Sequence, residues 1–172
     1  MYQVFQNLKE WQKIAKNITC WFYLLTSPPY ALYEKPQADM QALVRGGVTA
    51  ITYCGGYCTQ FADLQKYLVM RWSIDPNRDA EKMVKEFVDF KFGPAANLMM
   101  EFIKDVEKNR RDLRGVQVSS EYSSIPVESK RLVRWQKLFD RMEKITAKNK
   151  KYFNEVRMVR SAVDAWSLLF YS

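Results

Sequence analysis

Carboxylate chemistry is what remains open to this sequence as an enzyme, because its 172 residues include no histidine. A Ser-His-Asp or Cys-His arrangement needs an imidazole to move the proton, and Cys/His zinc sites need it as a ligand. The patterns G-x-G-x-x-G and G-x-x-x-x-G-K-[ST], which bind dinucleotides and phosphates, do not occur either. We therefore expect no metal and no cofactor.

Four aromatic residues are placed where they could form a binding site: Trp21, Tyr23, Tyr53 and Tyr57. They lie in or just after two short apolar runs, ITCWFYLL and VTAITY, and each offers a ring face together with a polar group. Packing in a core is the alternative role. It is the preferred interpretation of Trp21 and Tyr23, because aromatic residues in strands usually pack. For Tyr57, in a glycine-rich turn, the two roles are evenly balanced.

The three cysteines, Cys20, Cys54 and Cys58, are an odd set whose spacing matches neither a zinc ribbon nor a C-x-x-C redox pair. Their number is also far below the density of a disulfide-stabilised scaffold. We expect free and mostly buried thiols.

Positive charge is concentrated in the second half of the chain. Residues 101–160 carry 16 basic and 9 acidic side chains, a net of +7, whereas the first hundred carry 11 and 9, a net of +2. The acids that interleave with the basic residues of 130–151 and beyond are Glu128, Asp140, Glu143 and Glu155. Because no nucleic-acid motif accompanies this charge, a solvated helix face is the preferred interpretation over a phosphate-binding surface. No apolar run is long enough to span a bilayer, so we expect no membrane as partner. Nucleic-acid binding stays a third, weaker alternative, which predicts an affinity that falls steeply with salt.

The elements that must position these residues alternate between helix and strand in the first half. Helical spacing of apolar residues, β-branched runs of strand length, and Gly or Pro breaks define them. The expected order is a helix over 4–15, a strand over 18–25, a helix over 36–45, a strand over 48–53 and a helix over 61–72. This alternation predicts parallel strands with helical crossovers, as in part of a (β/α) barrel.

Only helical patterns follow residue 78. Asp79 is a suitable N-cap, Gly93 ends that helix, and Pro94 begins the next. After the stretch RGVQVSSEYSSIP, two long amphipathic patterns predict an antiparallel hairpin. The predicted fold is thus α/β and predominantly helical, with a barrel-like segment of two strands followed by a helical hairpin or bundle. We expect residues 1–112 and 113–172 to form these two parts, packed as one unit.

The segments LKEWQKIAKNITCWFYLL, GGVTAITYCGGY and FADLQKYLVMRWSIDPNRDAEKMVKEFVDFKFGPAA occur in an order that resembles domain of unknown function 4838. This is a bacterial, glycoside-hydrolase-like family, and the resemblance covers about residues 5–108, the carboxy-terminal part of its barrel region and the helices that follow. It implies contact with carbohydrate, with further barrel strands upstream of the position of Met1. It also implies export, whereas MYQVFQNLKEWQ lacks the order of a signal peptide, so the location stays open.

The sequence departs from the family where the family has acids. Trp21-Phe22-Tyr23 stands in place of tryptophan, aspartate and tyrosine, and Tyr53 stands in place of a glutamate. A glycosidase needs two carboxyl groups on either side of the bond it cleaves. The remaining acids, Glu34, Asp39 and Asp63, lie in a loop or at helix starts, where acids usually serve as caps.

Two functions follow from these observations. The first is a carbohydrate-associated domain, not catalytic by itself, that binds an oligosaccharide through Trp21, Tyr23, Tyr53 and Tyr57, because sugars stack their apolar faces on aromatic rings. The second is a helical module for protein interaction or self-association, without glycan activity. A two-strand segment leaves sheet edges and apolar faces that the terminal helices, a second copy or a partner protein must cover.

Overall fold

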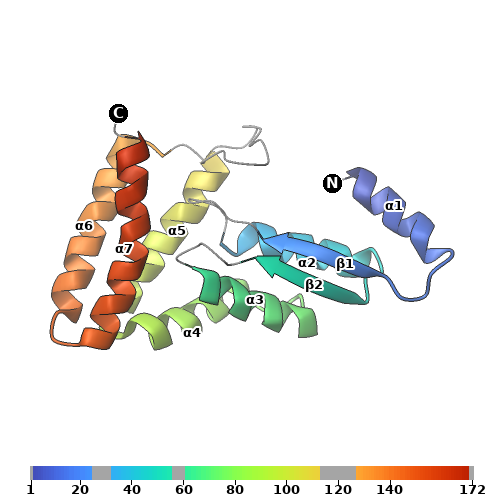
Figure 1. The fold of residues 1–172 in the computed structure, drawn as a ribbon, viewed down its shortest axis with the longest axis horizontal. Helices are drawn as coiled ribbons and strands as arrows, with labels where there is room; N and C mark the ends of the chain where they lie inside the picture. Colours follow the sequence, from blue (N-terminus) through green and yellow to red (C-terminus); the bar gives the residue numbers. More distant parts are fainter. Residues whose placement is uncertain (1, 25–31, 56–60, 113–126, 171–172) are drawn as a thin grey trace.

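The computed structural model describes residues 2–24, 32–55, 61–112 and 127–170. It is mostly helical and contains one parallel sheet, so the predicted fold class is confirmed. The elements are α1 (Tyr2–Gln12), β1 (Thr19–Leu24), α2 (Glu34–Arg45), β2 (Ala50–Gly55), α3 (Ala62–Ile74), α4 (Ala80–Phe92), the short 3-10 helix η1 (Gly93–Ala95), α5 (Ala96–Asp112), α6 (Ser129–Thr146) and α7 (Lys150–Phe170). The hairpin α6–α7 lies at one end of the molecule and α1 at the other, with the sheet between them (Figure 1).

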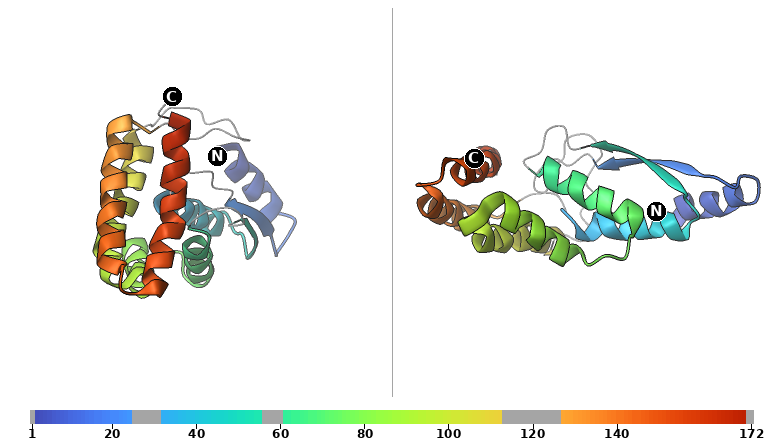
Figure 2. Two further views of the ribbon diagram at one scale, coloured as in Figure 1. Left: turned by 60° about the vertical axis from the view of Figure 1, so that its left-hand side comes forward. Right: turned by 90° about the horizontal axis from the view of Figure 1, so that it is seen from below.

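The sheet has helices on one side. Strands β1 and β2 pair in parallel with α2 as the crossover, and α3 lies on the same side as α2 (Figure 2). Successive side chains of a strand point to opposite faces. On the helix-covered face, Phe22 is buried and Ile51 packs against the core. On the other face, Trp21 and Thr52 are exposed.

The helix ends follow local rules. The Asp79 carboxylate accepts a hydrogen bond from the backbone N–H of Lys82 at 3.0 Å, so the predicted N-cap of α4 is confirmed. Gly93 ends α4 with φ of 51°, a conformation that favours glycine. A Cβ added there would lie 2.5 Å from Cζ of Tyr152, so α7 also closes over this turn.

The carboxy-terminal helices complete a core that continues into the sheet region. The ring of Phe102 on α5 lies 5.1 Å from that of Trp135 and 5.0 Å from that of Phe139, both edge-on and both on α6. On its other side Phe102 stacks with Phe61, the residue before α3, at 6.2 Å. One cluster of buried apolar side chains accordingly runs from Leu8 to Trp166.

Most element boundaries differ from the sequence-based expectation by one to three residues, and two of these differences have a clear physical cause. Helix α2 begins at Glu34, two residues before Pro36, because a side chain from α5 binds the backbone that precedes it. Strand β2 begins at Ala50, since Val48 and Thr49 form the turn that donates to the carbonyls of Leu43 and Ile18. The stretch RGVQVSSEYSSIP, residues 114–126, lies outside the described residues.

Candidate functional site

The carboxyl ends of β1 and β2 meet at one edge of the sheet, because the strands are parallel and Leu24 pairs with Gly55. In barrel-like folds, binding residues gather at this edge. The segments that leave it, 25–31 and 56–60, lie outside the described residues, and Tyr57 and Cys58 fall there. Cys20 and Cys54 are free and half-buried.

Trp21 lies on the uncovered face of the sheet. Its side chain is 60% exposed, and its register partner on β2 is Thr52, also exposed. Thr19 and Ala50, the first pair of the ladder, are exposed as well. The core-packing interpretation of Trp21 is therefore wrong: α2 and α3 lie behind the sheet and leave this face open.

Tyr53 lies on the opposite face. It pairs with Phe22, packs against the core and has a buried phenol oxygen. Trp21 and Tyr53 therefore do not share one binding face. Only the backbone of Tyr23 is described, in register with Cys54, so its use as a binding residue stays a prediction, as does that of Tyr57.

Helix α5 anchors the chain where it returns from both strand ends. After β1, the backbone N–H groups of Leu32 and Tyr33 donate to one carboxylate oxygen of Glu107, at 2.5 and 2.9 Å. After β2, Phe61 stacks on Phe102, as described above. Helix α5 therefore contacts Leu32, Tyr33 and Phe61, which lie after β1 and β2 in the sequence.

Glu107 is the residue of this region that the sequence analysis missed. Its side chain is fully buried, and burial raises its pKa above the ordinary value, against the two backbone N–H donors that lower it. Burial and the neighbouring Glu107 together raise the pKa of Tyr33 to about 12. A sequence signal existed, because Glu107 follows Ile103 by one helical turn on the apolar stripe of α5.

The acids proposed from the sequence are all engaged in ion pairs. Glu34 binds Arg110 at 2.9 Å and also pairs with Arg111, while Asp39 pairs with Lys35. Arg110 in addition lies 3.6 Å from Glu107, so it joins two carboxylates.

Asp63 is the third of these acids. It binds Lys91 at 2.6 Å, and this hydrogen bond lowers the pKa of its carboxyl group. These contacts serve helix starts and inter-helix packing, as expected for acids at such positions.

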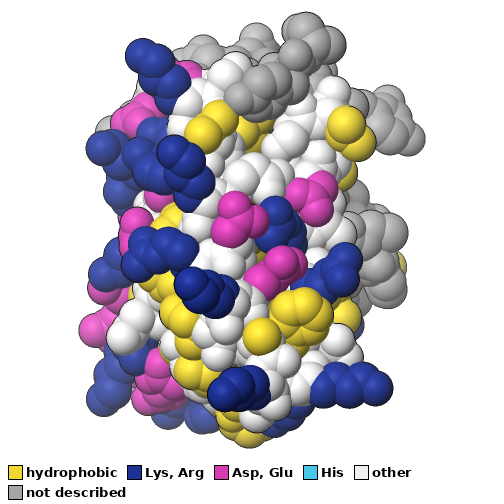
Figure 3. Space-filling model, turned by 90° about the vertical axis from the view of Figure 1, so that its left-hand side faces the viewer, with side chains coloured by type: hydrophobic (Ala, Val, Ile, Leu, Met, Phe, Trp, Pro, Cys, Tyr) yellow, Lys and Arg dark blue, Asp and Glu magenta, His cyan; other side chains and the backbone are white. Residues whose placement is uncertain are grey.

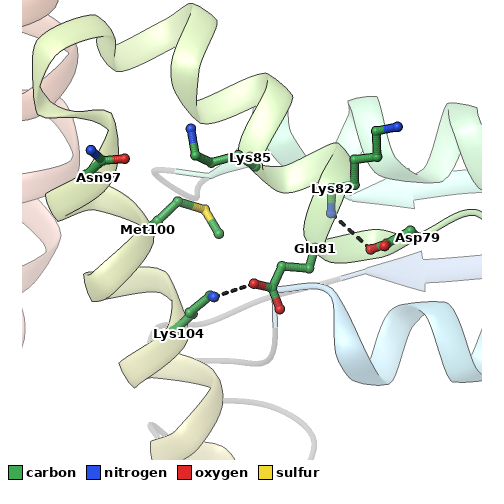
Figure 4. Close-up of a pocket in the computed structure, with 7 residues that line it drawn as sticks. All are labelled: Asp79, Glu81, Lys82, Lys85, Asn97, Met100 and Lys104. Carbon is green, nitrogen blue, oxygen red and sulfur yellow. Dashed lines mark hydrogen bonds and ion pairs between the residues drawn. The ribbon is translucent and has the colours of Figure 1, made fainter.

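A surface hollow of about 580 Å³ lies between the start of α4 and α5, away from the strand ends. Glu81 and Lys104 point toward each other across it and form an ion pair, while Asp79 caps α4 at its rim (Figure 4). Met100 is the apolar side chain of its lining, which contains no aromatic residue. The hollow therefore lacks a ring on which a sugar could stack.

Other kinds of site find no support in residues 2–24, 32–55, 61–112 and 127–170. No group of three potential ligands there could hold a metal ion. Over the same residues, no helix has the length and apolar character needed to cross a membrane.

No curated protein and no solved structure matches the chain. The family described as Domain of unknown function (DUF4838) matches residues 2–105. The matched part contains α1, both strands and the helices behind them, and it ends within α5, before the hairpin. Since the match extends over more than half of the 172 residues, the chain belongs to the DUF4838 family.

Proposed function

We propose that this domain binds carbohydrate on the uncovered face of its sheet, as a glycoside-hydrolase-like barrel segment that is not catalytic by itself. The observation that carries the proposal is the position of Trp21, which is 60% exposed beside Thr52 on the uncovered face of two parallel strands. An indole face can stack on the apolar face of a sugar ring, and a threonine hydroxyl can bond a sugar hydroxyl.

The arrangement of helices supports this use of the sheet. In a (β/α) barrel, the helices form the outer layer and the opposite strand face points inward, with the binding site at the carboxyl ends. Here α2 and α3 cover the face of Phe22 and Tyr53, so the face of Trp21 corresponds to the barrel interior.

The register of β1 against β2 supports the proposal that the domain is not catalytic by itself. Phe22 and Tyr53, which stand where the family resemblance implies acids, are direct partners across the sheet. Both positions lie on the face that α2 and α3 cover, so their side chains point away from the proposed binding face. A phenyl ring and a phenol occupy the positions here, and Glu34, Asp39 and Asp63 are held in ion pairs.

The test is a thermal melt against neutral oligosaccharides, with Trp21→Ala beside Trp11→Ala as the matched control. Trp11 is 57% exposed on α1, so both variants remove an exposed indole. A ligand that binds only the folded state, at a hundredfold excess over Kd, stabilises it by about 2.7 kcal/mol. We expect one sugar class to raise the Tm of the wild type and the Trp11 variant but not of the Trp21 variant. An equal rise in all three, or none in any, would contradict the proposal.

A second candidate function is self-association or protein binding, and exposed apolar side chains favour it. Met70 and Ile74 on α3 are 69% and 79% exposed, and Trp11 and Ile14 near the amino terminus are 57% and 76% exposed. Within the described residues the sheet has just two strands, which leaves an unpaired edge on each. Size-exclusion chromatography with light scattering should then show a dimer or larger species, and a monomer at high concentration would exclude self-association.

A further inference from the structure

One side of α6 carries a row of cations. Their spacing of three, four or seven residues places them on one helix face, and each is exposed. We define this row as the α6 stripe: Lys130, Lys137, Arg141, Lys144 and, just beyond the helix end, Lys148.

Two of the acids that interleave with these cations in the sequence pair with a residue of α7 in the structure. Asp140 and Glu143 point toward α7, where Arg160 binds them at 2.8 and 2.9 Å. Arg134, which continues the row, is neutralised by Asp105 of α5. Figure 3 shows many basic side chains along one side of this end of the molecule, with acidic side chains both among them and near the middle of the view.

Within the described part of the chain, no member of the α6 stripe takes part in an ion pair. The interpretation of this charge as a solvated, self-compensated helix face depended on the interleaved acids. Asp140 and Glu143 pair with Arg160 instead, so the stripe keeps a local excess of positive charge.

We propose that the α6 stripe is a binding surface for an acidic polysaccharide, one with a carboxylate or sulfate on its repeating units. From Lys130 to Lys144 the row is straight and about 21 Å long, at a rise of roughly 1.5 Å per residue. Neighbouring cations one helical turn apart can contact successive anionic groups of an extended polymer. The surface lies on the hairpin, apart from the sheet face, so this proposal and the proposed function can fail separately.

The side chains of α6 disfavour the other polyanions. Single-stranded nucleic acids need aromatic rings for base stacking, and the aromatic residues of α6, Trp135 and Phe139, are fully buried. No DNA-binding motif accompanies the stripe in the sequence. The apolar side of α6 is packed in the core, so the helix cannot insert into a lipid surface.

The test uses the whole chain and measures binding to immobilised polygalacturonate and dextran sulfate over a range of salt concentrations. The test variant is Lys137→Gln, Arg141→Gln and Lys144→Gln together. The matched control is Lys9→Gln, Lys16→Gln and Arg45→Gln, which removes the same charges from exposed positions near the other end of the molecule. Equal melting temperatures establish that both variants are folded.

We expect the wild type and the control to bind at least one polymer with an affinity that falls as salt rises, because bound cations release counterions. The stripe variant should bind about tenfold more weakly, with a smaller salt dependence. Equal binding by the two variants, or no binding by the wild type, would overturn the proposal. So would tighter binding to a DNA duplex or to vesicles containing an anionic phospholipid. A Trp21→Ala protein should bind these polymers as the wild type does.

Discussion

Removing the Glu107 carboxylate should destabilise the fold strongly. This group, on α5, accepts hydrogen bonds from the backbone N–H groups that precede α2. Glu107→Ala leaves the N–H groups of Leu32 and Tyr33 without their acceptor, and these residues are only 5% and 7% exposed. Each buried N–H left unpaired costs about 1–3 kcal/mol. We expect a loss of about 2–5 kcal/mol, and a smaller loss for Glu107→Gln, which keeps one acceptor oxygen.

The assay is urea unfolding followed by circular dichroism, with Glu101→Ala as the control. Glu101 lies on the same helix but is exposed, so its truncation should change the unfolding free energy by less than about 0.5 kcal/mol. If Glu107→Ala were no more destabilising than Glu101→Ala, α2 would not depend on this anchor.

The raised pKa of Glu107 gives the same experiment a pH dependence with a defined sign. The folded carboxyl group binds its proton more tightly than the unfolded one, whose ordinary pKa is 4.5. Between that value and the raised pKa, the folded state therefore holds the extra proton, and stability falls as pH rises. The Glu107→Gln variant has no carboxyl group to titrate at this position, so it does not lose stability in this way as pH rises. Its deficit relative to the wild type should shrink from pH 4 to pH 8, and a growing deficit would refute the assignment.

Three further outcomes are expected in the same unfolding assay. Gly93→Ala should cost about 2–4 kcal/mol, because φ of 51° strains an L-residue and the added Cβ meets the ring of Tyr152; an unchanged midpoint would contradict this packing. Asp79→Ala should cost about 1 kcal/mol through the lost N-cap of α4, and a neutral effect would mean that the cap is dispensable. Trp72→Ala should cost about 3–5 kcal/mol and Trp21→Ala far less, since the two side chains are 1% and 60% exposed; similar losses would place Trp21 in a core.

Helix and strand positions in this chain are largely local properties. The alternation of patterns over residues 4–72, the Asp79 cap, the Gly93 stop and the hairpin spacing each depend on residues a few positions apart, and the structure agrees with them. The start of α2 could not be predicted in this way, because its determinant, Glu107, lies 74 residues from Tyr33 in the sequence.

The candidate site was predictable in part. Strand periodicity placed Trp21 and Tyr53 in two adjacent strands, and the structure confirms that they lie in β1 and β2. It could not decide which strand face the helices cover, because that depends on the hand of the crossover and on where α3 packs. That choice leaves Trp21 exposed and puts Tyr53 against the core.

The sequence by itself determined the secondary structure, the family and the chemistry open to the chain, because residue types and short-range spacing govern all three. The tertiary structure alone decided where charges and rings are available. Asp140 and Glu143 lie among the cations of α6 in the sequence, yet they bind Arg160 across the hairpin, and the α6 stripe has no ion-pair partner among the described residues. Electrostatic pairing depends on distance in space, so a row of interleaved charges could not reveal which of them remain free for a partner.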